Sequence, residues 1–225
     1  HWQPVEYNAL HGGIERWFEP LPAALVADAA WGRLLSALAE RAAMLRAAPQ
    51  AAWYVEAHPF RIDTTDGIGR PTPEGAHRDG VDFVAVILVH REAITGGETR
   101  VFEATGPHGV RFALTTPWTA LLLDDTRVIH ESTPIQPLGA GEGHRDTLVL
   151  TYRAHGFQDP QQGGAANLHL SAGQADIHGD GEEAEKYSKT FHRAMCLVSG
   201  EVNEHGQAYA QSRCEPACTR QASQQ

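Results

Sequence analysis

The chain has 225 residues, of which 42% are hydrophobic and 20% are charged, so it is large and apolar enough to fold around a core. Its formal net charge of −10 argues against nucleic acid or an anionic membrane surface as the main partner, because both favour basic patches. The apolar run 83–89 is far shorter than the roughly 20 residues of a membrane helix. We therefore expect a small-molecule substrate. Because all three cysteines lie after residue 195, we also expect a cytoplasmic location.

Residues 28–48 predict an amphipathic helix. Asp28 is suited to cap its N-terminus, and Pro49 follows its last residue. Apolar side chains recur at steps of three and four, at Trp31, Leu35, Leu38, Ala42 and Leu45. We expect this apolar face to pack against a sheet.

The stretch 53–153 has the pattern of a β domain. Its short β-like runs lie at 53–62, 81–89, 98–102, 109–114, 118–125, 127–132 and 147–153. Since no helical pattern separates them, they predict an antiparallel sandwich or barrel, and we expect a mainly β domain over 1–160 with the helix beside it. The Gly-, Gln- and Glu-rich stretch 161–225 predicts a weakly ordered or peripheral tail, with one short helix near 183–197.

The tripeptide His-Arg-Asp occurs twice, and the first copy, 77–79, suggests a metal site. In a strand His77 and Asp79 would point the same way, and His130 supplies one polar group in a β-like run. Two imidazoles and one carboxylate on a β-scaffold are typical of non-haem Fe(II) oxygenases. A surface turn and a structural zinc site stay open as alternatives. A kinase catalytic loop is excluded, because the Asn that it requires is Val84 here.

The second copy, 144–146, predicts a different role. Arg145, Thr147 and Val149 share one face of a strand. If that face is the inner one, Arg145 is a fixed cation with a hydroxyl beside it, which suits a carboxylate ligand. The alternative is a strand-end arginine in solvent.

His77-x-Asp79, His130 and Arg145-x-Thr147, in this order, resemble the Fe(II)- and 2-oxoglutarate-dependent dioxygenases. The runs RPTPEGAHRDGVDFV, GGETRVF and RDTLVLTYR are similar, more specifically, to the small bacterial branch that hydroxylates free L-amino acids, including the L-isoleucine hydroxylases. The resemblance covers about 50–160 and does not extend to the tail.

The resemblance implies a double-stranded β-helix, or jelly roll, with Fe(II) held at its mouth by His77, Asp79 and His130. It implies 2-oxoglutarate bound to the metal and to Arg145 and Thr147, O2 as co-substrate, and succinate and CO2 as products. Related halogenases carry Gly or Ala where this chain has Asp79, so hydroxylation is favoured over halogenation. Desaturation and ring closure stay open.

Two further residues are weaker candidates for binding 2-oxoglutarate and the substrate. Tyr54 would donate a hydrogen bond to 2-oxoglutarate, and Arg61 would bind a substrate carboxylate if its strand face is the inner one; an exposed edge arginine is the alternative. Gly96-Gly97 predicts a tight turn, and His58 and His90 have no partner at ligand spacing. A cupin-like binding module and a zinc hydrolase or isomerase are the rival functions. The resemblance leaves a homodimer open.

Overall fold

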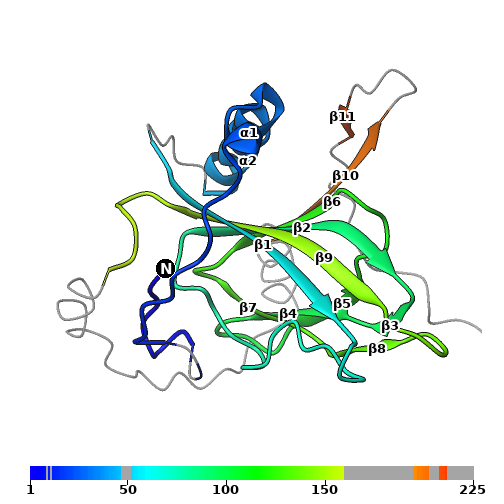
Figure 1. Ribbon diagram of the computed structural model, residues 1–225. Coiled ribbons are helices and arrows are strands. Elements are labelled where there is room, and N and C mark those ends of the chain that lie inside the picture. The colour runs from blue at the N-terminus through cyan, green and yellow to red at the C-terminus, as the bar shows by residue number, and fades with distance from the viewer. Residues whose placement is uncertain (9, 11, 47–51, 160–194, 203–207, 212–225) are drawn as a thin grey trace, which may run out of the picture.

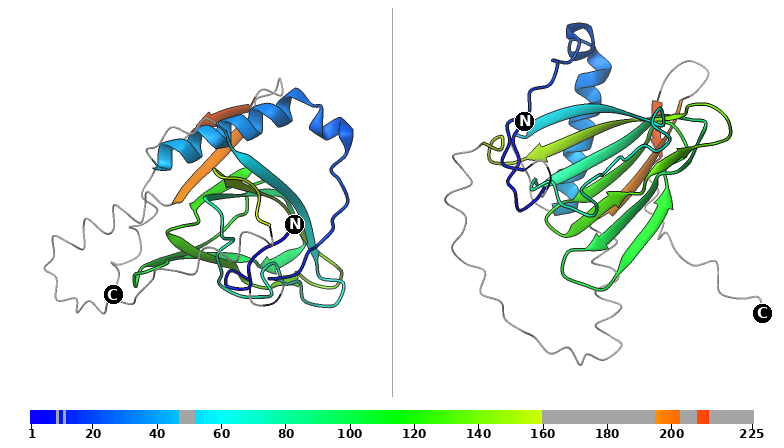
Figure 2. Two further views of the ribbon diagram at one scale, coloured as in Figure 1. Left: turned by 90° about the vertical axis from the view of Figure 1, so that its left-hand side faces the viewer. Right: turned by 60° about the horizontal axis from the view of Figure 1, so that its bottom comes forward.

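The computed structural model describes residues 1–8, 10, 12–46, 52–159, 195–202 and 208–211. Two β-sheets face each other, and a helix covers the outer side of the larger one (Figures 1 and 2). The helices are α1 (Ala23–Val26) and α2 (Ala29–Arg46). The strands are β1 (Tyr54–Asp63), β2 (Phe83–Glu92), β3 (Ile94–Gly96), β4 (Glu98–Glu103), β5 (Gly109–Ala113), β6 (Thr119–Asp124), β7 (Val128–Ser132), β8 (Ile135–Pro137), β9 (His144–Arg153), β10 (Met195–Val202) and β11 (Ala208–Gln211).

The pairing of these strands is that of a jelly roll. The large sheet has the order β1-β9-β2-β6-β10-β11, and the strands of the second wall are β5-β4-β7 and the pair β3-β8. All the described pairs are antiparallel. The predicted mainly β, jelly-roll class is therefore confirmed.

The first part of the central strand β2 is buried on both faces, which explains its unbroken apolar run. Phe83, Ala85 and Ile87 point toward α2, where they pack with Leu38 and Ala42. The alternate residues of β2 point into the space between the sheets. A strand with two buried faces needs apolar residues at every position. Each large side chain buried here contributes roughly 1.5–3 kcal/mol to stability.

The elements follow the sequence pattern except where it is short or weak. The helix predicted over 28–48 is α2, whose Asp28 carboxylate accepts a hydrogen bond from the Ala30 amide at 2.7 Å. The sequence did not predict α1, β3 and β8, because three or four residues are too few to show a period. Of the helix predicted near 183–197, residues 183–194 lie outside the described residues, and the last three begin β10, which pairs with β6.

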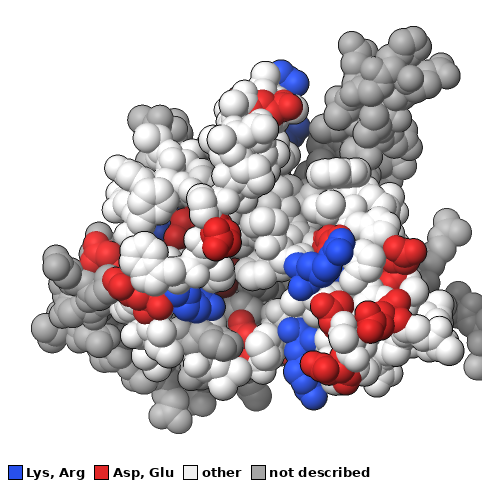
Figure 3. Space-filling model, viewed as in Figure 1, with Lys and Arg blue, Asp and Glu red and all other residues white. Residues whose placement is uncertain are grey.

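The described surface agrees with the charge and hydropathy of the sequence. On the face shown in Figure 3, acidic and basic side chains are interspersed rather than gathered into one basic surface. Within the described residues, every helix is too short or too polar to cross a bilayer.

The described residues of the N-terminal segment 1–18 lie across the open end of the barrel and are held by main-chain hydrogen bonds (Figure 1). The amide of Arg16 donates to the His1 carbonyl at 2.9 Å, and the amide of Gly13 donates to the Gln3 carbonyl at 2.7 Å. The Gln3 side chain in turn donates to the main-chain oxygen of Asp79 at 3.0 Å. This segment, which shows no periodic pattern in the sequence, is therefore fixed to the main chain at Asp79.

Candidate active site

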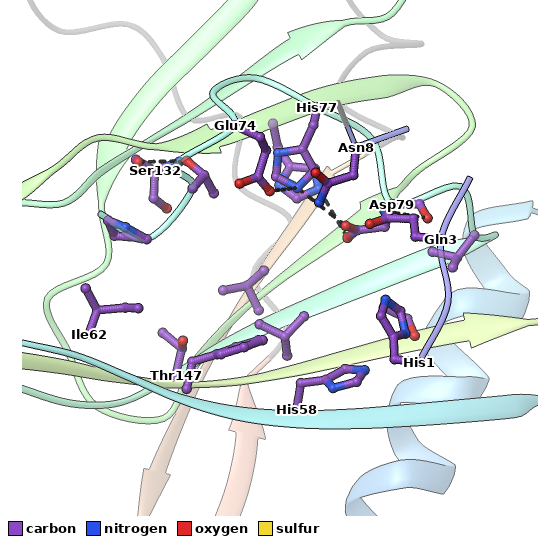
Figure 4. Close-up of a pocket in the computed structure, with 18 of the residues that line it drawn as sticks. His1, Gln3, Asn8, His58, Ile62, Glu74, His77, Asp79, Ser132 and Thr147 are labelled. Carbon is purple, nitrogen blue, oxygen red and sulfur yellow. Dashed lines mark hydrogen bonds and ion pairs between the residues drawn. The ribbon is translucent and has the colours of Figure 1, made fainter. Parts of the chain in front are cut away.

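Three side chains that the sequence singled out converge between the two sheets. The Nε2 atom of His77 lies 3.4 Å from one carboxylate oxygen of Asp79 (Figure 4). The Nε2 atom of His130 lies 3.5 Å from the other. One ligand atom from each residue lies within 4.8 Å of the other two. The three groups are therefore placed to share one metal ion.

The local backbone differs from the predicted strand. His77 forms only an isolated β-bridge with His130, in which each amide donates to the other residue's carbonyl, at 3.0 and 2.9 Å. The carbonyl of Gly75 lies 2.9 Å from Nδ1 of His77. If Nδ1 carries the proton of this hydrogen bond, the lone pair of Nε2 is free to face the metal position.

Asp125, which sequence reasoning missed, holds the loop before β2 that carries His77 and Asp79, called the ligand loop below. Its side chain is fully buried and accepts main-chain hydrogen bonds from Asp79, Gly80 and Val81, at 3.1, 2.8 and 3.1 Å. Burial and the nearby charge of Asp79 raise the pKa of Asp125. The sequence offered only a pair of acids after an apolar strand, which is also the pattern of an exposed turn.

The electrostatics of the three ligands fit a divalent cation. Burial opposes ionisation of Asp79, but the two imidazoles hold its pKa well below the ordinary value, so it is a carboxylate. Burial alone would lower the pKa of His77, but the Asp79 carboxylate and the Gly75 carbonyl raise it to about 9. The buried Nε2 of His130 has no hydrogen-bond partner among the described residues. A cation between these atoms would satisfy all three groups.

A buried arginine lies at one end of the same pocket. Arg145 is 3% exposed, and its Nε and Nη2 atoms are buried without a hydrogen-bond partner among the described residues. Burial and the neighbouring charge of Arg91 lower its pKa to about 10, so the guanidinium remains charged at neutral pH. Thr147, 5% exposed, also lines the pocket. The face of β9 that carries Arg145 and Thr147 is therefore the inner one, as the carboxylate-binding interpretation requires, and the alternative of an arginine in solvent is wrong.

The turn predicted at Gly96-Gly97 lies beside this arginine. Both glycines have positive φ, 78° and 68°. A Cβ atom on Gly97 would lie 2.9 Å from the Ile135 side chain, 3.2 Å from Arg91 and 3.8 Å from Arg145. A side chain at this position would therefore clash with Ile135 and crowd the Arg91 guanidinium, while its contact with Arg145 would be an ordinary van der Waals contact.

The cavity itself has a volume of about 180 Å³ and lies between β1, β9 and the ligand loop. Ile62 and Thr147 lie toward one end of it, and His1 and His58 toward the other, with the metal ligands on the facing wall (Figure 4). The N-terminal segment contributes lining residues that the sequence did not indicate: His1, Gln3, Asn8, Arg16 and Phe18. They come from an aromatic, irregular stretch without a helix or strand period, so the sequence alone does not show which of its side chains line a cavity.

Two weaker candidates lie away from this cavity. Arg61 points to the outer face of β1, where its side chain is 63% exposed and forms an ion pair of 2.7 Å with Asp146. The inward orientation considered for Arg61 is therefore wrong; the register of β1 turns His58, Phe60 and Ile62 inward instead. Tyr54 is 44% exposed, and its ring packs against that of Phe157 beyond the cavity lining.

Two further groups of metal-ligand type occur among the described residues. On the outer face of the large sheet, His90 approaches His144 at 3.1 Å, but the nearby Asp146 is already bound by Arg61. The second group comprises His1, Glu56 and His58. His58 and His90 have no partner at ligand spacing in the sequence. In the fold, His58 gains His1 from the N-terminal segment as a neighbour, and His90 gains His144 through the pairing of β2 with β9.

Comparison with known proteins identifies a family. A model of the 2OG-Fe dioxygenase family matches residues 1–151 of the 225. The fold is similar to the crystal structure of a bsmA homolog from Methylobium petroleophilum PM1, with a TM-score of 0.66 and 66% identity over 71% of this chain. The match covers 64% of that chain, so this sequence spans less than two thirds of that relative's length. No curated protein matches the chain.

Two more distant structures share the fold. IDO from Bacillus thuringiensis has a TM-score of 0.56 and 17% identity, over 63% of this chain and 65% of that one. The Fe(II)/α-ketoglutarate-dependent dioxygenase TqaL has a TM-score of 0.50 and 22% identity, over 61% of this chain and 58% of that one. Since one family model accounts for most of the chain and the fold agrees with it, the chain belongs to the 2OG-Fe dioxygenase family, which implies Fe(II), 2-oxoglutarate and O2 as cofactor and co-substrates.

Proposed function

We propose that this protein is an Fe(II)- and 2-oxoglutarate-dependent oxygenase that hydroxylates an unactivated C–H bond of a free L-amino acid. In the overall reaction the substrate gains one oxygen atom from O2, and 2-oxoglutarate takes the other as it becomes succinate and CO2. Bound iron supplies the oxidising chemistry, and the protein supplies binding, orientation and exclusion of water.

The observation that carries this proposal is the buried guanidinium of Arg145. A charge that is 3% exposed and has no acidic partner among the described residues is costly, so it predicts an anionic ligand. The ligand would lie between Arg145 and the group formed by His77, Asp79 and His130. A dicarboxylate with a keto group fits these requirements, because one end can bind a metal and the other can bind Arg145 and Thr147.

Other residues hold the ligand loop in place and close the cavity. Asp125 holds the ligand loop through three main-chain hydrogen bonds, and the N-terminal segment closes one side of the cavity. Asp79 provides a carboxylate ligand where a halogenase would leave a position for halide, which favours hydroxylation. The free amino acid as substrate is supported by the similarity of 70–84, 96–102 and 145–153 to the amino-acid hydroxylase branch. The cytoplasmic location and the homodimer stay predictions.

The test is a substrate panel with two separate readouts. The purified protein is incubated with Fe(II), 2-oxoglutarate and O2 together with each proteinogenic L-amino acid, and succinate and the mass gain of one oxygen atom are measured. We expect both to rise with at least one amino acid, and both to vanish in His130→Ala. Succinate without an oxygenated amino acid would contradict the substrate class alone. A preparation that retains zinc and never consumes 2-oxoglutarate would favour the binding-module or hydrolase alternatives.

A further inference from the structure

A second arginine lines the cavity at the end opposite Arg145. In the pairing of β1 with β9, Ile62 lies level with Arg145, and His58 lies level with Val149. Four residues along a strand span about 13 Å. Arg16 belongs to the His58 end, because Phe18 contacts both: the Arg16 guanidinium lies 6.0 Å from the Phe18 ring centroid, and the His58 ring lies 5.6 Å from it. The cavity therefore has a cation at each end, with the metal ligands between them.

Arg16 is not used by the fold in the way that other arginines are. Arg61 and Arg100 form ion pairs, whereas Arg16 forms none with any described residue, and its Nε atom is buried without a hydrogen-bond partner. The side chain is only partly exposed and faces the cavity. An unpaired, half-buried guanidinium in a cavity predicts an anionic ligand.

The position of Arg16 is fixed relative to the metal ligands. Its amide donates to the His1 carbonyl, and its own carbonyl accepts from the His1 nitrogen, both at 2.9 Å. The Gln3 side chain bonds to the main-chain oxygen of Asp79 at 3.0 Å. A ligand that binds Arg16 would thus be held at a set place beside the ligand loop.

Aromatic rings surround this end of the cavity. The rings of His58 and Phe60 are stacked at 6.0 Å, and those of Phe18 and His58 meet edge to face at 5.6 Å. Burial lowers the pKa of His58, so its ring is neutral at pH 7 and does not add a charge to that of the Arg16 guanidinium. The buried Nε2 atom of His58 has no hydrogen-bond partner among the described residues. The surroundings suit a molecule with an anionic group, a further polar group and a short carbon chain.

We propose that Arg16 binds the carboxylate of the oxygenase's prime substrate and that His58 donates or accepts a hydrogen bond to the same molecule. This inference rests on the proposed function, because it assigns the Arg145 end to 2-oxoglutarate and leaves the Arg16 end to the substrate. The carbon to be oxidised would then lie between Arg16 and the metal, against the rings of Phe18 and Phe60.

The experiment compares each free L-amino acid with its carboxamide, beginning with L-isoleucine and L-isoleucinamide. Equilibrium binding is measured by anaerobic calorimetry on protein loaded with Fe(II) and 2-oxoglutarate. We expect wild type to prefer an acid to its amide by roughly 10- to 100-fold, the range of one charge-assisted hydrogen bond. In Arg16→Gln the preference should vanish, and in Arg16→Lys it should be partly retained. Arg33→Gln, at an exposed position of α2, should leave it unchanged.

Other measurements separate this inference from the proposed function. Binding of 2-oxoglutarate and its slow turnover without amino acid are measured in wild type and in Arg33→Gln, where they should agree within about twofold because position 33 lies outside the cavity. Retention of the acid preference in Arg16→Gln would overturn the inference, and so would a wild type that binds no acid more tightly than its amide. Absence of 2-oxoglutarate turnover in wild type would instead overturn the oxygenase assignment.

Discussion

The two His-Arg-Asp tripeptides have the same sequence and opposite orientations in the fold. In the first copy, His77 and Asp79 face the cavity, and the Arg78 side chain donates to the Asp125 carbonyl at 2.6 Å. In the second copy, 144–146, the arginine faces the cavity, and the acid binds Arg61 on the outer face of the sheet. Residue identity alone therefore does not decide which member of the tripeptide acts.

The backbone around each copy makes the difference. The second copy lies inside β9, where alternation places Arg145 on the opposite face from its neighbours. The first copy lies before β2 in a loop that forms one bridge, and Asp125 fixes it by accepting three amides. Regular strand geometry thus orients one copy, and a buried carboxylate orients the other.

The largest expected difference between the copies concerns their acids. Asp79→Ala removes a carboxylate from the ligand group, so we expect affinity for Fe(II) to fall by at least about 100-fold and succinate formation to vanish. The measurement is iron content after dialysis together with succinate yield.

The matched control is Asp146→Ala, which removes the acid of the second copy. This residue contacts Arg61 outside the cavity, so iron content and succinate yield should match those of wild type. Equal losses in the two variants would show that the second copy also takes part in the metal site.

For the arginines, unlike the acids, substitution in the second copy should have the larger effect on activity. Arg145→Met removes the buried cation, and we expect the KM for 2-oxoglutarate to rise by roughly 30-fold or more. Without 2-oxoglutarate the same variant should unfold at a higher temperature than wild type, because the buried charge has no partner among the described residues. Steady-state kinetics and thermal unfolding measure the two effects.

Arg78→Met is the counterpart in the first copy. It removes a hydrogen bond to the Asp125 carbonyl and the contact of the guanidinium with the Tyr7 ring at 5.6 Å, so it should lower the unfolding temperature. A larger rise in the KM for 2-oxoglutarate in Arg78→Met than in Arg145→Met would reverse the assignment of the two arginines.

Metal binding at the first copy should depend on pH. The pKa of His77 is raised to about 9 in the metal-free protein, so below that pH a metal ion must displace a proton from the ring. We expect affinity for Mn(II) to rise about tenfold per pH unit between pH 7 and pH 8.5. The protonated ring also stabilises the metal-free fold, fully below pH 6.5 and no longer above about 9, so metal-free stability should fall over the same range.

Calorimetry in two buffers of different ionisation enthalpy measures the proton released per Mn(II). Release close to one proton at pH 7 would agree with the raised pKa of His77. A pH-independent affinity, with no proton release, would show that the ring is already neutral.

The sequence predicted those parts of this comparison that depend on regular periodicity. Strand alternation predicted that Arg145 and Thr147 share one face of β9, although not that this face is the inner one. The apolar run 83–89 was enough to predict that β2 is buried. The first copy was placed in a strand that does not exist there. His77 and Asp79 still face the same metal position, because Asp125 and the bridge to His130 hold the irregular loop in place. Such a loop shows no repeating pattern of apolar and polar residues in the sequence.

The inner face of β1 could not be chosen from the sequence. Its alternate sets, one with Trp53 and Arg61 and one with His58 and Phe60, both contain apolar and polar residues. Pairing with β9 decides between them, and this contact connects residues almost a hundred positions apart in the chain. The pocket residues of the N-terminal segment were missed for the same reason, because their contacts with the ligand loop are long-range.

The smallest expected effect concerns the outer face of the second copy. Arg61 forms a bidentate ion pair with Asp146, at 2.8 and 2.7 Å, in an exposed position where solvent screens the charges. Arg61→Ala should therefore change the KM values for 2-oxoglutarate and for the amino acid by less than about twofold, because it alters nothing on the inner face. A tenfold rise in the amino-acid KM would instead place Arg61 in the substrate site and would require β1 to pair with β9 in the other register, so that His58 and Phe60 would turn outward.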